Sequence, residues 1–598
     1  MSLLANIENV AIALALGVMM LVPLVEIALR GTLQTGISNS AAWVQHLTLV
    51  VGMLGGAIAA REDRLLALST ITQFLGGKWK AAARIFGYGF AAAITGLLVW
   101  ASIQLVVSER EGGKILAYGV PVWVIQAVLP LGFVALTVRL LRHASGRWAG
   151  RSAAVALAAA VVWIGVRPPV PPEQLVLPAL VTLLLATLAG TPVFVTLGGA
   201  AVILFWGAGV SIANIPVDHY RLVTNPTLPT IPLFTLAGYF LAEGGASKRL
   251  VRVFDTLVGQ FRGGPAIVTA LVCAFFTSFT GASGVTILAL GGLLMPILLA
   301  ARYSEKSALG FITGAGSLGV LLPPCLPLIL YAIIAKVTIE QMFLGGIVPG
   351  ILLVLMTCWW GIRIGPKLEG ARRAFDWRAA GRALFEAKWE LMLPVVALAA
   401  LFGGFATPVE ASALTAFYAF VVEVFIYKDL KLTKDVPRVM AECGLLIGGV
   451  LLILGVALGF TNYLIDAQIP ARLVEWTTGS IHSAWVFLLL LNLFLLVVGC
   501  LMDIFSAIIV VVPLILPLGE AFGIDPVHLG IIFLANLELG YLTPPVGMNL
   551  FLSSYRFNKP VPEVVRAAFP MFLVLLAGVL MITYIPALTT TLPKWLGR

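Results

Sequence analysis

The stretch Gly319–Pro327, which reads Gly-Val-Leu-Leu-Pro-Pro-Cys-Leu-Pro, lies between two apolar segments that would otherwise form a single membrane span. Proline has no backbone N–H, and its ring disfavours helical geometry in the preceding residue, so we expect the helix to stop at Leu322 and to resume beyond Pro327. In hydrocarbon the carbonyl groups freed by such a break find no water, so the break has to be buried in protein or to line a polar cavity. The stretch therefore predicts a broken helix inside the membrane.

A second stretch of the same kind follows at Gly540–Asn549, which reads Gly-Tyr-Leu-Thr-Pro-Pro-Val-Gly-Met-Asn. Gly540 lies 221 residues after Gly319 (540 − 319), and Pro517 lies the same 221 residues after Pro296 (517 − 296). This common separation, the repeat offset, aligns both breaks and the apolar segments that precede them. Two interrupted spans at corresponding positions are typical of the binding site of a secondary transporter built from repeated halves.

The composition is that of a membrane protein. Of 598 residues, 60% are hydrophobic and 11% are charged, and the mean hydropathy is +1.03. A helix needs roughly 20 apolar residues to cross the hydrocarbon core, and about fifteen stretches of the chain are suitable. Their long continuous apolar runs favour helices over the alternating strands of a barrel. The net charge of +10 lies in short loops, where it orients the protein in the lipid membrane, so no nucleic-acid partner is expected.

We predict an all-α polytopic membrane protein with three parts. Residues 1–151 carry four spans, at about 7–29, 43–60, 85–107 and 120–141, and form a four-helix scaffold region. Residues 152–173 form a connecting helix and a Pro-rich linker, and residues 174–598 form the transport module. Lys and Arg gather after the second and fourth spans, which predicts that these ends and the N-terminus are cytoplasmic.

The transport module contains two segments that are apolar at both ends and have a small or polar centre, at about 266–300 and 484–518. Basic residues on both sides of the first segment predict a re-entrant hairpin that enters from the cytoplasm and returns there. The second segment is expected to enter from the opposite side. The repeats, at about 174–365 and 391–592, would then be inverted, which is the architecture that permits alternating access.

Each hairpin tip is expected to face the break of its own half, so that backbone carbonyls and small hydroxyls surround a pocket. Hard cations such as Na⁺ prefer oxygen ligands, and carbonyls at helix C-terminal ends supply them. We therefore predict two Na⁺ sites. The candidate ligands of the first are Thr280, Ala282, Ser283, Gly319, Leu322 and Pro324, and those of the second are Met502, Asp503, Gly540, Thr543 and Pro545. Half-helix N-termini and polar side chains between the tips would bind an anionic substrate, and the candidates are Ser283, Thr286, Asn536 and Asn549.

For several of these residues a purely structural role is an alternative to ligand binding. A single diproline in a membrane helix can be a simple kink. The hydroxyls of Thr280 and Ser283 can instead bond to their own helix. A carboxylate deep in an apolar segment, as at Asp503, is costly and by default functional, although it could be protonated or solvated at the mouth of the site. Glu538 could bind a cation, carry a proton or pair with a distant base.

These motifs resemble the membrane component of a tripartite ATP-independent periplasmic (TRAP) transporter in which the small and large subunits are fused. The likeness to the large subunit runs from about Leu175 to Leu592. It rests on Gly-Ser-Leu-Gly-Val-Leu-Leu-Pro-Pro-Cys-Leu-Pro at 316–327, Gly-Cys-Leu-Met-Asp at 499–503, Gly-Ile-Asp-Pro-Val-His at 523–528 and Leu-Thr-Pro-Pro-Val-Gly-Met-Asn-Leu at 542–550. The region up to about Arg151 looks like the small subunit, with Arg30, Trp43, Gly52 and Arg61 as landmarks.

The resemblance implies an elevator mechanism in a bacterial inner membrane. Na⁺ influx would drive uptake of a small organic acid, a carboxylate or a sulfonate, that a separate periplasmic binding protein delivers. Two positions depart from the family pattern. The family tip usually reads Ser-Gly-Ser-Ser, whereas residues 280–283 read Thr-Gly-Ala-Ser, so Ala282 can offer only its carbonyl. Glu538 lies where the family usually has an uncharged residue, which leaves open whether protons are coupled as well.

Three other functions are weighed against this prediction. A related inverted-repeat exchanger would capture its anion without a binding protein. An intramembrane enzyme would need a nucleophile with a base, or a metal cluster, and the dispersed histidines and cysteines form neither pattern. A channel is disfavoured because two hairpins from opposite faces suit an occluded site better than a continuous pore.

Overall fold

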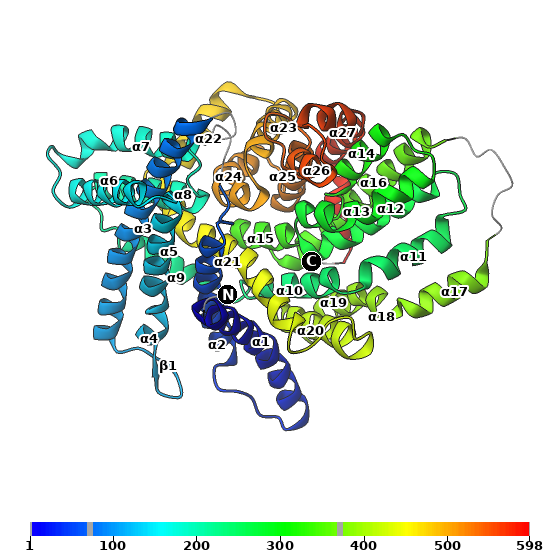
Figure 1. Cartoon of the computed structure of the whole chain (residues 1–598), viewed down its shortest axis with the longest axis horizontal. Coiled ribbons are helices and arrows are strands. Elements are labelled where there is room, and N and C mark those ends of the chain that lie inside the picture. Colours follow the sequence, from blue (N-terminus) through cyan, green and yellow to red (C-terminus); the bar gives the residue numbers. More distant parts are fainter. Residues whose placement is uncertain (1–2, 68–75, 367–374, 597–598) are drawn as a thin grey trace. The chain divides into compact units, whose positions relative to one another are not determined.

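The computed structural model describes residues 3–67, 76–366 and 375–596, and it is almost entirely helical (Figure 1). Within this described part, 12 helices are long and apolar enough to cross a membrane, and six shorter apolar helices accompany them. The predicted all-α polytopic fold is therefore confirmed. The only strands in the described part are β1 (Ile115–Ala117) and β2 (Val120–Pro121), which form a small antiparallel pair. The fourth predicted span consequently starts at Val122 and not at Val120.

The chain divides into two compact units. The first contains residues 1–232 and 437–470, and the second contains residues 233–436 and 471–598. The helices of the first unit are α1 (Leu3–Thr32), α2 (Ser40–Arg61), α3 (Gly77–Gly112), α4 (Val122–Gln126), α5 (Val128–Ala144), α6 (Trp148–Val166), α7 (Pro172–Leu188), α8 (Val193–Gly207), α9 (Asn214–Val223) and nearly all of α21 (Asp435–Asp466).

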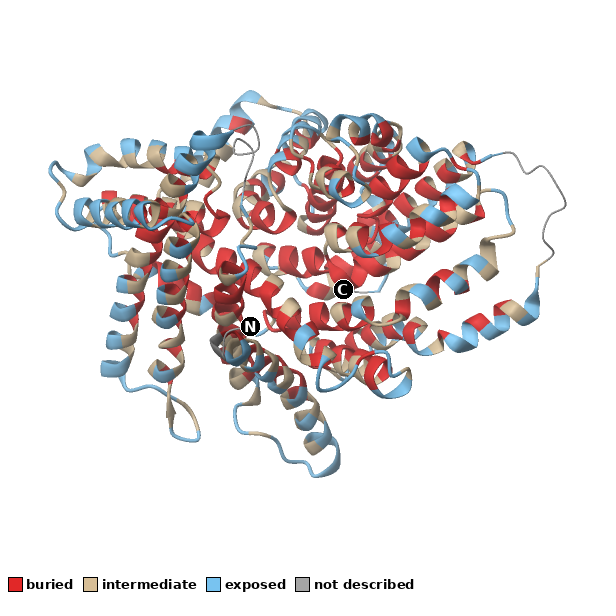
Figure 2. Cartoon of the chain, viewed as in Figure 1, coloured by how far each residue is buried: buried red, intermediate tan, exposed pale blue. Residues whose placement is uncertain are grey.

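Small residues let helices of the first unit pack backbone to backbone. A Cβ atom added at Gly55 of α2 would lie 2.0 Å from the Gly444 carbonyl oxygen of α21. Glycines at such crossings are the usual way for membrane helices to approach closely, since the hydrophobic effect does not drive association within lipid. Most of α6 in contrast is exposed, and Ala154 is its one buried residue (Figure 2).

The second unit holds both predicted hairpins and both predicted breaks. Its helices up to the end of the first half are α10 (Thr230–Glu243), α11 (Ala246–Val258), α12 (Gly264–Thr280), α13 (Ser283–Ala300), α14 (Glu305–Ala315), α15 (Leu326–Ala335) and α16 (Ile339–Ile364). The remaining ones are α17 (Trp377–Glu386), α18 (Lys388–Leu391), α19 (Leu393–Phe402), α20 (Pro408–Val421), the π-helix η1 (Val422–Ile426), α22 (Ile469–Ser480), α23 (Ala484–Leu501), α24 (Ile504–Ala521), α25 (Pro526–Gly540), α26 (Met548–Phe557), α27 (Val561–Tyr584) and α28 (Ala587–Trp595).

The first break is longer than expected and has different ends. Helix α14 ends at Ala315 and α15 begins at Leu326, so the predicted stop at Leu322 and restart beyond Pro327 are both wrong. The early stop is associated with a tertiary contact, since the Thr277 hydroxyl donates a hydrogen bond to the Gly316 carbonyl (2.7 Å) just after the helix ends. The early restart has a local cause, because Pro327 lies in the first turn of α15, where a missing N–H costs nothing.

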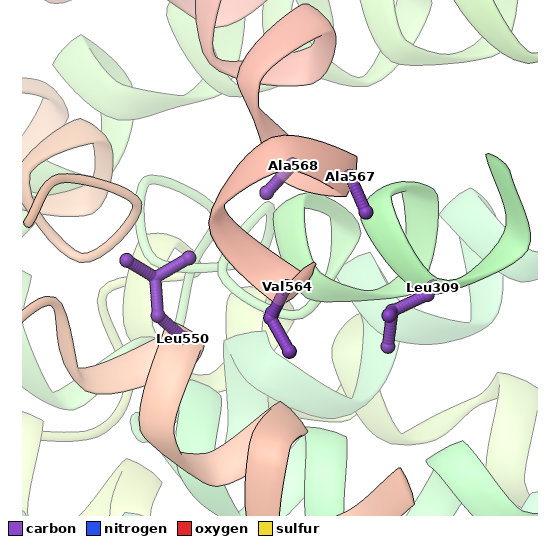
Figure 3. Close-up of a cluster of buried hydrophobic side chains, with 5 residues drawn as sticks. All are labelled: Leu309, Leu550, Val564, Ala567 and Ala568. Carbon is purple, nitrogen blue, oxygen red and sulfur yellow. The ribbon is translucent and has the colours of Figure 1, made fainter. Parts of the chain in front are cut away.

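The second break separates α25 from α26, and its diproline is exposed, whereas the helix that leads into it is buried. Every residue of α25 from Val527 to Gly540 is buried (Figure 2). The helix that follows the break packs against elements of both halves. Leu550 of α26 lies in one apolar cluster with Leu309 of α14 and with Val564, Ala567 and Ala568 of α27 (Figure 3). The two broken helices are therefore parts of one packed core.

Candidate functional site

The first hairpin tip lies directly against the first break. Helices α12 and α13 are joined by Gly281, which has a positive φ of 66°, and by the extended Ala282. A Cβ atom at Gly281 would lie 2.6 Å from the Cβ of Leu326, the residue that opens α15. The Cys325 thiol donates to the Thr277 carbonyl (3.7 Å). The tip thus contacts the C-terminal edge of the break.

The second hairpin tip lies against the second break in the same way. Met502 and Asp503 join α23 to α24. The Gly547 N–H at the end of the break donates to the Cys500 carbonyl (3.1 Å). The Ile504 N–H donates to the Tyr541 hydroxyl oxygen (2.7 Å), so the first turn of α24 is attached to the start of the break.

The contacts of the two halves follow the register seen in the sequence. A Cβ atom at Gly319 would lie 2.4 Å from the Ser278 nitrogen, and one at Gly540 would lie 2.6 Å from the Gly499 Cα. Ser278 and Gly499 are themselves separated by the repeat offset, since 499 − 278 equals 540 − 319. Both Pro323–Pro324 and Pro544–Pro545 are cis. Because of these close contacts, Gly319 and Gly540 occupy corresponding positions against the two hairpins, where a side chain would not fit.

Three of the four substrate candidates belong to two neighbouring sets of buried hydrogen bonds beside the first tip. The Ser283 hydroxyl donates to the Asn549 side-chain oxygen (2.7 Å), and the Asn549 amide donates to the Thr313 carbonyl (3.2 Å). Thr286 and Thr277 share a hydroxyl contact of 2.7 Å. Because Thr277 donates its proton to Gly316, Thr286 is the donor in that pair. The two sets start from Ser283 and Thr286 of the same helix, α13, and together they involve residues of α12, α13, α14 and α26.

Asn536 belongs to a different cluster. Its amide donates to the Asn492 side-chain oxygen and to the Ile532 carbonyl (2.9 Å), and the Thr583 hydroxyl donates to the same Asn492 oxygen (3.2 Å). These partners lie on α23, α25 and α27. The structure thus groups Ser283, Thr286 and Asn549 and does not bring Asn536 to them.

The predicted cation ligands surround the breaks as backbone oxygens and small hydroxyls. The Thr280 hydroxyl points to the Ala282 carbonyl (3.5 Å), and Gly319 and Leu322 present carbonyls in the turns of the first break. Thr543 donates to the Gly540 carbonyl (2.7 Å) in the second. Within the described residues, no group of three or more His, Cys, Asp or Glu side chains converges as a metal site. Neutral oxygen donors of this kind are of the type that a hard cation prefers.

Asp503 has a well-defined local role as the N-cap of α24. Its Oδ1 accepts hydrogen bonds from the Phe505 and Ser506 N–H groups (3.0 Å each), and its Oδ2 accepts one from the Ser506 hydroxyl (2.6 Å). An N-cap aspartate satisfies orphan N–H groups and interacts well with the positive end of the helix dipole. Its position at the tip also leaves it beside the second break.

Glu538 lies inside the core, where it is 1% exposed. Among the residues that the structure describes, neither carboxyl oxygen finds a hydrogen-bond partner of standard geometry, and Ser317 is the polar side chain that interacts with Glu538. Glu538 and Ser317 are also separated by the repeat offset, since 538 − 317 equals 540 − 319. They therefore occupy equivalent positions in the two halves and meet each other.

Two residues of the site are absent from the sequence-based candidates. Thr277 bonds to the first break through both its hydroxyl and its carbonyl, and Tyr541 supports the start of α24. Thr277 lies in the polar centre of the first hairpin, and Tyr541 directly follows the glycine of the second break. These positions within the two motifs are the sequence features from which both residues could have been predicted.

A polytopic helical protein with two interrupted helices held against two helical hairpins has the construction of a membrane transport protein. Residues 180–588 match the family described as "Tripartite ATP-independent periplasmic transporter, DctM component". Residues 19–150 match the DctQ component of the same transporters. The chain belongs to the TRAP transporter family, with a DctQ region followed by a DctM region in one polypeptide. It is a multi-pass permease of the bacterial inner membrane and not an enzyme.

Several relatives have the same family names. The chain is 35% identical over 405 residues to the C4-dicarboxylate TRAP transporter large permease protein DctM of Pseudomonas aeruginosa, covering 67% of this chain and 94% of that one. It is 30% identical over 504 residues to the isethionate TRAP transporter permease protein DctMQ of Oleidesulfovibrio alaskensis, covering 82% of this chain and 78% of that one. Among solved structures, the YdaH transporter of Alcanivorax borkumensis aligns with a TM-score of 0.47 at 15% identity, covering 72% of this chain and 98% of that one.

Proposed function

We propose that this permease uses an inward Na⁺ gradient to take up a small organic anion, a carboxylate or sulfonate, that a separate periplasmic binding protein delivers. Family membership supports the dependence on a binding protein. The substrate class is supported by two relatives, which are named for a C4-dicarboxylate and for isethionate. Both compounds are small anions with compact acidic groups.

The single observation that carries the mechanism is the recurrence of tip-to-break contacts at the repeat offset. Gly319 packs against Ser278 in the first half, and Gly540 packs against Gly499 at the equivalent place in the second. Two such halves, inverted with respect to each other, would form a transport domain that moves as one body past a scaffold, as in an elevator. The proposed orientation places the N-terminus in the cytoplasm, following the distribution of Lys and Arg.

The ions are proposed to occupy one site at each tip. Carbonyls of the breaks and hydroxyls of the tips supply neutral oxygens, and Asp503 adds a carboxylate to the second site. The anion is proposed to bind between the tips, beside Ser283, Thr286 and Asn549. These three side chains are fully buried in this conformation, with exposed fractions of 0 to 1%. A closed substrate site of this kind would keep the anion from leaking between the two sides.

Uptake into proteoliposomes tests the proposal directly. We expect labelled C4-dicarboxylate or isethionate to accumulate only when an inward Na⁺ gradient and the cognate binding protein are both present. A K⁺ gradient of equal size is the control for ionic strength and membrane potential. Equal uptake without the binding protein would favour the direct exchanger, and equal uptake with K⁺ would remove Na⁺ coupling.

Variants of Asp503 separate its capping role from the proposed ion binding. Asp503→Asn keeps a side-chain oxygen for the Phe505 and Ser506 N–H groups but removes the charge, so we expect stability near that of the wild type together with a large rise in the Na⁺ concentration that half-saturates uptake. Asp503→Ala removes both functions and is expected to cost about 1 kcal/mol of stability as well. Unchanged Na⁺ dependence in Asp503→Asn would limit this residue to capping.

A further inference from the structure

A basic pocket of about 580 Å³ lies in the first unit where α3 begins, α5 ends and α6 begins. Four cationic side chains line it: Lys80, Arg84, Arg142 and Arg151. None of the lining residues is acidic. This pocket is far in the sequence from the transport motifs, and the transport proposal does not use it.

The charges of the pocket are only partly compensated. Arg84 pairs with Asp63 (2.7 Å) and donates to the His143 carbonyl (2.8 Å), and Arg151 donates to the Ser145 carbonyl (2.8 Å). Lys80 and Arg142 form no ion pair within the described part of the chain. Asp63 thus pairs with one of the four cations, and the pocket has a surplus of positive charge that calls for an anion.

The position of the pocket indicates where that anion resides. Helix α3, the α4–α5 segment and α6 are three of the candidate membrane spans, and the pocket lies at the ends of all three. Trp79 and Trp148, beside the lining residues, are 76% and 82% exposed. Tryptophans with this exposure at span ends are typical of the headgroup layer. The Lys and Arg bias predicts that this end is cytoplasmic, the side where anionic lipids attract basic residues.

We propose that this pocket binds the phosphodiester headgroup of an anionic membrane phospholipid. Lys80 and Arg142 supply the uncompensated charges, while Arg84 and Arg151 are held in place by their carbonyl partners. Gly77, the first residue of α3, also lines the pocket. The N-cap residue Gly76 offers no side-chain cap to the first turn of α3, so the N–H groups of that turn add to the attraction. Basic pockets between membrane helices on the cytoplasmic side are suited to diphosphate lipids such as cardiolipin.

Native mass spectrometry of the full chain, titrated with cardiolipin, phosphatidylglycerol or phosphatidylcholine, tests this proposal. The double variant Lys80→Gln/Arg142→Gln removes the two unpaired cations. Each basic residue near a lipid surface contributes enough that we expect cardiolipin affinity to fall roughly 30-fold in this variant. Phosphatidylcholine, which has no net charge, should bind weakly to the wild type and to the variant.

The chain offers a matched control at the same helix ends. Lys78 and Arg147 are exposed and lie close in sequence to the lining residues but do not line the pocket. Lys78→Gln/Arg147→Gln removes the same charge at the same membrane level, and we expect an effect below about threefold because screening weakens more distant charges. Equal losses in the two double variants, or equal binding of phosphatidylcholine, would overturn the proposal. Displacement of cardiolipin by inorganic phosphate at matched ionic strength would assign the pocket to free phosphate instead.

Discussion

Replacing Gly540 with alanine is expected to reduce Na⁺-driven uptake roughly tenfold or more. The new Cβ atom would lie 2.6 Å from the Gly499 Cα and 2.7 Å from the Gly499 carbonyl carbon. These are backbone atoms, so the break and the tip of the second hairpin would have to move apart. Overpacking of this kind costs about 1–3 kcal/mol, and about 1.4 kcal/mol is already a factor of ten in affinity. The carbonyls proposed to hold the second ion would move with the break.

The equivalent change in the first half should have the same result. A Cβ atom at Gly319 would lie 2.2 Å from the Ala274 carbonyl oxygen. Gly449→Ala is the matched control, since a Cβ atom there meets nothing within 4 Å and alanine favours the helix. Uptake rate, Na⁺ dependence and thermal unfolding in detergent are measured for all three variants. Uptake at the wild-type rate in Gly319→Ala and Gly540→Ala would show that the tip-to-break contacts do not position the ions.

Replacing Arg249 with methionine is expected to lower the free energy of unfolding by about 3–5 kcal/mol, the cost of leaving buried carboxylates without their cation. The Arg249 guanidinium on α11 contacts Glu390 (2.6 Å), Glu423 (3.4 Å) and Asp429 (2.6 Å), and it stacks over the Tyr427 ring at 3.8 Å. The side chains of Glu390 and Glu423 are 0% exposed. Arg249 therefore holds α11, α18 and η1 together through one charge.

The pH dependence of the free energy of unfolding provides a second test of this prediction. Burial raises the pKa of Glu390 in the native protein, and Arg249 opposes that rise. A carboxyl with a raised native pKa stabilises the fold at low pH and loses that contribution as the pH rises through the native pKa. Without Arg249 the pKa of Glu390 should rise further, so the deficit of Arg249→Met should grow as the pH is raised above the ordinary range of glutamate.

Two variants make the interpretation specific. Arg252→Met lies on the same helix, and its ion pair with Glu386 (2.8 Å) is exposed at both ends, so we expect a loss of at most about 1 kcal/mol. The triple variant Arg249→Met/Glu390→Gln/Glu423→Gln removes the two fully buried charges, leaving only the partly exposed Asp429, and should recover most of the stability lost in Arg249→Met. Failure of the triple variant to recover stability would assign the effect to lost packing of the arginine side chain.

Much of the fold could be predicted from the sequence, because few backbone conformations satisfy their hydrogen bonds within lipid. Long apolar runs have to form helices, and a diproline has to interrupt one, since unsatisfied backbone groups are costly in hydrocarbon. The helical pairs expected at 266–300 and 484–518 correspond to α12–α13 and α23–α24. The repeat offset, read from glycines and prolines, recurs in the contacts of Gly319 and Gly540.

The details of the site depended on contacts between distant residues. Ser283 and Asn549 are 266 residues apart, and no local pattern predicts that one donates to the other. The end of α14 at Ala315 is associated with a hydrogen bond from Thr277, and Asn536 pairs with Asn492 because α23 and α25 pack together. A side chain's hydrogen-bond partner is chosen by the packing of several helices, which local periodicity does not encode.

The sequence by itself determined that this protein is a helical permease with two interrupted spans in register. The reason is that backbone hydrogen bonding in lipid depends on residues close together in the sequence. Only the tertiary structure decided which polar groups meet at those interruptions, where the breaks begin and end, and which buried acids share Arg249. Those outcomes depend on the three-dimensional packing of helices whose residues lie hundreds of positions apart.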